Sequence, residues 1–147
     1  MKLECGMKFI NEQGQEITLK RSEILPGYEI TVANNVTIDS PVNNPFFKGI
    51  NVLQLSKKLK GFRDNPDLQK LLEPIIVNTD IKLNLADNQF AIFEPDKRLT
   101  NKKLQSIDYI FGNNMTVAPT FVNFGLKDIK LKKGDVIGTI IIHEAVI

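Results

Sequence analysis

Three short apolar segments, separated by turn residues, close this chain. Residues 120–124 run into Gly125, residues 129–131 run into the turn 133–135, and residues 136–142 follow that turn. Runs of Val, Ile, Thr and Phe bounded by Gly, Asp and Asn are typical of β-strands. The end of the chain is therefore predicted to fold as strand, turn, strand, turn and strand.

Alternation of apolar and polar residues continues this β pattern upstream. The segments predicted to be strands are 2–10, 15–20, 28–32, 36–38, 75–85 and 89–93. The first two are expected to form a hairpin across the turn 11–14. The next two are expected to form a second pair across Asn34-Asn35, since paired asparagines tolerate the left-handed backbone of tight turns. Many short strands with frequent turn residues predict a sandwich or a barrel.

Residues from about 50 to 73 break the alternation, because their apolar residues are spaced for helices and Asn65-Pro66 reads as a helix start. We therefore predict one domain, 1–147, with a helical insertion over residues 40–74. The insertion is a candidate interaction surface, or its helices only cover an open end of the β structure. Its candidate contact residues are Phe46, Phe47, Lys57, Lys58, Lys60 and Arg63.

Composition excludes few functions. The chain has 147 residues, 24% charged residues and a formal net charge of +2, which is too small a charge to argue for nucleic-acid or membrane binding. Cys5 and His143 are the only residues of their types, so the sequence supports neither a disulfide nor a transition-metal site. No cofactor is expected. An export signal is absent by the usual criteria, which makes the cytosol the default location.

The order of several motifs resembles one known superfamily. Asn123-Phe124-Gly125, then Lys133-Gly134-Asp135-Val136-Ile137-Gly138, are similar to the closing turns of the deoxyuridine triphosphatase (dUTPase) and deoxycytidine triphosphate deaminase superfamily. The segments 26–30 and 77–83 resemble its Gly-Tyr-Asp-Leu and Ile-Lys-Leu segments, with Glu29 in place of Asp. The resemblance implies a mainly β, dUTPase-like distorted jelly roll or β-barrel and a homotrimer. The short helical insertion departs from the family, which usually joins the two flanking strands by a short loop.

The catalytic motifs of that superfamily are degenerate here. Residues 95–99 stand where its triphosphatases carry an Arg-Ser-Ser phosphate-binding motif. Asp96 would repel a phosphate there, and Lys97 and Arg98 replace compact hydroxyl donors with long cations. The segment is interpreted either as a charged, solvent-facing turn or as an altered phosphate site. The deaminase branch needs a catalytic glutamate where this chain has Thr120.

The water-activating aspartate of the triphosphatases lies in a hairpin that this sequence matches only in part. Residues 106–112 offer Asp108 followed by Tyr109, but the spacing to Asn123 is longer than in the family and no arginine precedes Gly112. Asp108 is therefore a candidate general base only in an altered site.

Three functions remain. The favoured one is a non-catalytic, trimeric structural or docking protein, such as a phage capsid decoration protein or another virion component, located in the virion or the host cytoplasm and bound to a protein partner. The alternative is a nucleotide-binding protein or nucleotide pyrophosphatase that uses Asp108, Tyr109, Lys97 and Arg98 in altered roles, with residual hydrolysis left open. A regulator that imitates the enzyme to engage another protein is a third possibility.

Overall fold

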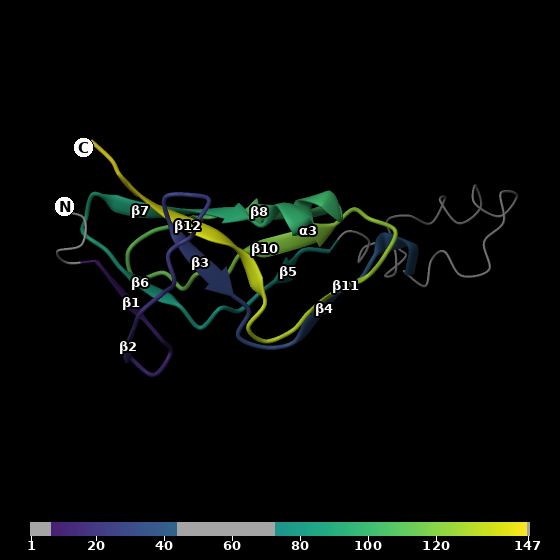
Figure 1. Cartoon of the computed structure of the whole chain (residues 1–147), viewed down its shortest axis with the longest axis horizontal. Helices are drawn as coiled ribbons and strands as arrows, with labels where there is room; N and C mark the ends of the chain where they lie inside the picture. The colour runs from purple at the N-terminus through teal and green to yellow at the C-terminus, as the bar shows by residue number, and fades with distance from the viewer. Residues whose placement is uncertain (1–6, 44–72, 147) are drawn as a thin grey trace, which may run out of the picture.

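Short antiparallel strands are the main regular structure of the computed structural model, which describes residues 7–43 and 73–146 (Figure 1). The described part also holds one 3-10 turn, η2 (Pro41–Asn43), and one α-helix, α3 (Lys97–Asn101). The strands are β1 (Lys8–Ile10), β2 (Glu16–Ile17), β3 (Tyr28–Thr31), β4 (Val36–Ile38), β5 (Ile75–Ile76), β6 (Lys82–Asn84), β7 (Gln89–Pro95), β8 (Leu104–Asp108), β9 (Ile110–Phe111), β10 (Thr120–Asn123), β11 (Ile129–Leu131) and β12 (Val136–Glu144).

The described strands form four small sheets, none of which closes into a barrel. Their strand orders are β2-β1-β6, β5-β10-β8, β11-β4 and β3-β12-β7-β9. Most neighbours in these sheets are far apart in sequence, as in the pairing of β4 with β11 and of β3 with β12. The chain therefore crosses repeatedly between sheets, which is the pattern of jelly rolls rather than of simple meanders.

The longest strand, β12, holds the largest sheet together by pairing with β3 on one side and β7 on the other. Thr139 of β12 is in register with Glu29 of β3 and with Glu94 of β7. Because residues in register on neighbouring strands point to the same face, these three side chains form a row across the sheet. That face is opposite the one on which Phe93 and Ile140 enter the core.

A single hydrophobic core lies between the sheets. In β7 the side chains of Ala91 and Phe93 are buried while Glu94 is exposed, as alternation requires. The Phe93 ring meets the Phe121 ring edge to face, with ring centroids 5.9 Å apart. The largest side chains that are almost fully buried are Phe93, Phe111, Phe121, Ile30, Ile38, Leu83, Leu104, Ile137 and Ile140.

Several predicted strands are confirmed. β1 and β2 form the first predicted hairpin, with Phe9 opposite Ile17. The three closing strands are found as β10, β11 and β12. The turn between β11 and β12 places Gly134 at φ 92°, a backbone conformation that favours glycine.

One pairing prediction and one strand prediction are wrong. The segments 28–32 and 36–38 are strands, but β3 and β4 belong to different sheets and do not pair with each other. The predicted strand 75–85 is broken into β5 and β6, because Asp80 adopts φ 56° and its N–H bonds the Asn78 side chain. Local polar contacts of this kind compete with a continuous ladder.

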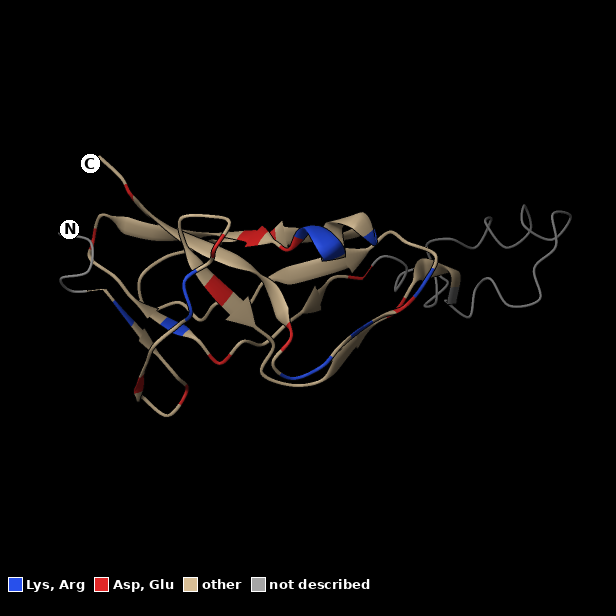
Figure 2. Ribbon diagram, in the orientation of Figure 1, with Lys and Arg blue, Asp and Glu red and all other residues tan. Residues whose placement is uncertain are grey.

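Helix α3 is not among the expected elements, since the sequence indicates either a turn or an altered phosphate site at 95–99. The helices predicted over about 50–73 of the 40–74 insertion lie, up to residue 72, outside the described residues, as do all six contact residues proposed there. No helix in the described ranges is long and apolar enough to cross a bilayer. Lys and Arg are interspersed with Asp and Glu along the described ribbon (Figure 2).

Candidate functional site

Asp96 begins helix α3 at the place where the sequence resemblance expects a phosphate-binding motif. Its backbone is extended (φ −61°, ψ 136°), and its Oδ1 accepts a hydrogen bond from the Arg98 N–H at 2.9 Å. An aspartate in this position satisfies a backbone donor that the first helical turn leaves free. The buried Leu99 side chain then holds the helix on the protein. Asp96 is therefore a helix cap, and its carboxylate is already bonded.

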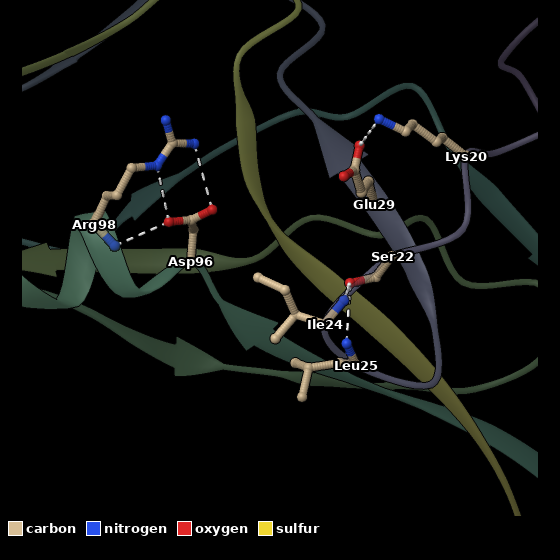
Figure 3. A network of polar contacts seen from close by, with 7 residues as sticks. All are labelled: Lys20, Ser22, Ile24, Leu25, Glu29, Asp96 and Arg98. Carbon is tan, nitrogen blue, oxygen red and sulfur yellow. Dashed lines mark hydrogen bonds and ion pairs between the residues drawn. The ribbon is translucent and has the colours of Figure 1, made fainter.

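The Arg98 side chain turns back onto the same carboxylate (Figure 3). Its Nε donates to Asp96 Oδ1 at 3.1 Å and its Nη2 donates to Oδ2 at 3.4 Å. The side-chain hydrogen bond from Arg98 lowers the pKa of Asp96 below its ordinary value, against the raising effect of burial. The same bond raises the pKa of Arg98. The cation best suited to bind a phosphate is thus paired within the chain.

A groove of about 600 Å³ lies between this helix and the loop that leads into β3. The loop, Ser22 to Leu25, forms one wall, the start of α3 forms the other, and β12 forms the floor through Val136, Thr139 and Ile141. Figure 3 shows β12 passing between the Asp96–Arg98 pair and the Lys20–Glu29 pair. We refer to this feature as the β12 groove.

The loop wall of the β12 groove is fixed by local bonds. The Ser22 Oγ accepts hydrogen bonds from the N–H groups of Ile24 and Leu25, each at 3.2 Å. Gly27 sits directly against the floor, because a Cβ at this position would lie 2.1 Å from the Ile140 carbonyl oxygen. Only glycine allows this approach, so the residue sets how closely the loop covers β12.

Carboxylates outnumber cations around the β12 groove. Its lining contains Glu23, Glu29, Glu94 and Asp96, against Lys97 and Arg98. Glu29 is 4.0 Å from Lys20 Nζ, in an ion pair that is largely open to solvent on the lysine side. The potential in the groove is therefore unfavourable for a polyphosphate and favourable for a cation.

A second cavity of about 500 Å³ opens beside β8, on the other side of the end of β7. Tyr109 and Phe124 are both about half exposed at its edge. Its remaining lining residues are Phe93, Glu94, Pro95, Thr100, Lys103, Leu104, Gln105 and Ser106. Two aromatic faces, one lysine and several hydrogen-bonding side chains suit a flat, polar ring better than a triphosphate.

The four residues of the alternative nucleotide site do not share one cavity in the described chain. Lys97 and Arg98 line the β12 groove, and Tyr109 lines the second cavity. Asp108 is exposed at the end of β8 and lines neither. The segment 106–112 is not a hairpin, since β8 pairs with β10 while β9 pairs with β7. Whether these residues bind a nucleotide stays a prediction.

Sequence reasoning missed most of the residues that line the β12 groove, among them Glu23, Ile24 and Glu94. Glu94 follows the alternation of β7 and could have been assigned to its outer face. Ile24 is an isoleucine in a loop between Ser22 and Pro26, and 90% of its surface is exposed, an unusual position for so apolar a side chain. Within the described residues no group of His, Cys, Asp and Glu is arranged to hold a metal ion.

Comparison with solved structures shows which known fold this architecture matches. The chain superimposes on the EIAV dUTPase with a TM-score of 0.62 and 15% identity, over 95% of this chain and 88% of that one. This chain has the dUTPase fold. A mutant dUTPase from phage phi11 of S. aureus gives a TM-score of 0.62 at 10% identity, over 96% of this chain and 92% of that one.

A mutant dUTPase of Staphylococcus bacteriophage 80alpha gives a TM-score of 0.63 at 10% identity, over 97% of this chain and 92% of that one. No protein-family model and no curated protein matches the sequence. The predicted dUTPase-like, mainly β fold is confirmed. Identities this low establish the fold alone, so the function has to be argued from the site.

Proposed function

We propose that this chain is a non-catalytic docking protein on the dUTPase fold, which assembles as a homotrimer and binds a protein partner. The observation that carries the proposal is the double hydrogen bond between Asp96 and Arg98, at the place of the phosphate-binding motif. A triphosphate would have to displace a carboxylate from the only arginine in the β12 groove.

Electrostatics opposes a triphosphate there for a second reason. Two like unit charges 5 Å apart repel by about 3 kcal/mol at an effective dielectric constant of 20. A phosphate near Asp96 would also approach Glu29 and Glu94, which line the same groove. Lys20 offsets Glu29 from outside the lining, and the lining itself adds Lys97, which is exposed. Binding of a polyanion is therefore disfavoured before any catalytic step.

Phage proteins with this fold have a regulatory role. Phage dUTPases, such as that of Staphylococcus bacteriophage 80alpha, control transfer of virulence genes by a proto-oncogenic G protein-like mechanism. A protein that regulates by binding another protein needs a stable fold and a specific surface. Neither of these requires catalytic activity. We place this chain in a virion, as a capsid decoration or other structural component, because icosahedral shells offer threefold positions to a trimer.

We expect no hydrolysis of dUTP. Purified protein incubated with dUTP and Mg²⁺ should release pyrophosphate no faster than a protein-free control, because the phosphate position is occupied by the Asp96–Arg98 pair. An active dUTPase assayed in parallel provides the positive control. If the wild type released pyrophosphate and the Asp108→Asn variant did not, the non-catalytic proposal would be refuted.

A nucleotide-binding protein, or a nucleotide pyrophosphatase with an altered pocket, is the second candidate. It is favoured by the cavity beside β8, where Tyr109 and Phe124 stand exposed. A ligand at 100 times its Kd stabilises a protein by about 2.7 kcal/mol, which thermal unfolding detects. A deoxynucleotide that raises the unfolding midpoint of the wild type but not of Tyr109→Ala would select this candidate. If no deoxynucleotide raises the unfolding midpoint, the docking proposal is retained.

We expect a homotrimer in solution. Large apolar side chains stand exposed on β5, β8, β9 and the loop after β10, where an assembly would cover them. These residues are Ile76, Ile107, Ile110, Phe124 and Leu126. Light scattering should give three times the chain mass of 16.6 kDa. A mass of one chain, unchanged over a hundredfold range of concentration, would contradict the trimer.

A further inference from the structure

The β12 groove combines apolar surface with negative charge. Ile24 projects from the loop wall with 90% of its surface exposed, and Leu25, Val136 and Ile141 line the space beneath it. An apolar side chain that is exposed at the rim of a groove gains most when a partner covers it, since burial of a leucine-sized side chain is worth about 1.5–3 kcal/mol.

Two carboxylates face each other across the floor. Glu29 of β3 and Glu94 of β7 are both in register with Thr139 of β12, so they flank it on one face of the sheet. Neighbouring strands lie about 4.8 Å apart, which sets the two glutamate Cα atoms about 10 Å apart. A cation placed over Thr139 would lie within reach of both carboxylates.

Thr139 lies at the centre of this floor. Its residue surface is only 8% exposed, and it lines the groove. Among residues 7–43 and 73–146, no hydrogen bond joins its hydroxyl to another side chain or to the backbone. No described side-chain polar atom is both buried and unpaired, so this hydroxyl is open to the groove, where it can accept a hydrogen bond from an arriving donor.

Negative charge exceeds positive charge among the lining groups without an ion pair. Glu23 and Glu94 form no ion pair with any described residue, against Lys97 as the one lining cation in the described chain that also forms none. Arg98 on the helix wall is engaged by Asp96. The walls are also held in place before binding, by the Ser22 hydrogen bonds and by the close approach at Gly27. A preorganised site loses little entropy when it binds.

We propose that the β12 groove binds a linear segment of a partner protein in which a lysine or arginine adjoins an apolar residue. The cation lies over Thr139 between Glu29 and Glu94, and the apolar residue packs on Ile24 and Ile141. This inference rests on the docking function proposed above and names the chemistry of its partner. Opposite charges across an interface mainly set specificity and association rate. Because salt screens exposed charges, we expect binding to weaken as the salt concentration is raised.

Selection from a random dodecamer peptide library tests the proposal on the full chain. Peptides recovered on the wild type should be enriched at least fivefold in dipeptides that join Lys or Arg to Leu, Ile, Val or Phe. The enrichment should disappear on the double variant Glu29→Gln/Glu94→Gln. It should persist on Glu144→Gln, because Glu144 is an exposed glutamate at the end of β12, outside the groove. Circular dichroism of each variant confirms that it is folded.

Three results would overturn the assignment: no such enrichment on the wild type, equal enrichment on the double variant, or an oligomer mass that falls in the double variant. The last would mean that a second copy of this chain fills the groove. The same preparations are assayed for pyrophosphate release from dUTP. Release refutes the docking function itself, whereas no release together with no peptide enrichment refutes only the groove assignment.

Discussion

Phe93→Ala should lower the free energy of unfolding by about 3–5 kcal/mol, the range found for large aromatic truncations in protein cores. Phe93 is 1% exposed and packs edge to face on Phe121. It sits in β7 opposite Ile140 of β12, in the middle of the largest sheet. Removing its ring leaves a cavity that rigid strands on both sides cannot close. Urea denaturation followed by circular dichroism measures the loss.

Ile24→Ala is the matched control for that experiment. It also removes a large apolar side chain, but one that is 90% exposed, so its effect on unfolding should stay within about 0.5 kcal/mol. The two variants together separate burial from side-chain size. Equal denaturation midpoints would mean that Phe93 is not a core residue and that the packing described for β7 and β12 is wrong.

Strand positions could be predicted from the sequence, but strand partners could not. The alternation over 36–38 and over 129–131 identified β4 and β11 correctly. Nothing local showed that these two strands pair with each other, about ninety residues apart. The Asn34-Asn35 turn suggested instead that β4 would pair with β3. Alternation reports which face of a strand is buried, whereas the pairing depends on contacts between distant segments.

The candidate site was predictable only in its local part. Lys97 and Arg98 are adjacent in sequence, and both line the β12 groove. The resemblance also led to the prediction that Asp96 would repel a phosphate, and in the structure its carboxylate caps α3 and bonds the Arg98 guanidinium. Glu23, Glu29 and Glu94 come from three separate segments, so their meeting in one groove depends on how β3, β12 and β7 pair.

Asn123 in the closing turn motif has a structural role that its sequence context only partly indicated. Its Oδ1 accepts a hydrogen bond from the Gly125 N–H at 2.8 Å, which closes the turn after β10. Its Nδ2 donates to the carbonyl oxygens of Lys127 and Ile38, at 2.9 and 3.1 Å. One buried side chain thus joins β10, the loop before β11 and the end of β4.

Asn123→Ala should therefore lower the free energy of unfolding by roughly 3 kcal/mol, since each buried group left without a partner costs about 1–3 kcal/mol and entering water offsets part of the total. Urea denaturation midpoints give the measurement. Asn34→Ala is the control, because Asn34 is exposed and its side chain bonds no described residue. If both asparagine variants unfold at the wild-type midpoint, the turn is held by its backbone alone. A large loss of unfolding free energy in Asn123→Ala alone would show that this turn anchors β4 to β10. The turn motif that resembles the dUTPases would then serve stability in this chain, independently of the altered phosphate motif.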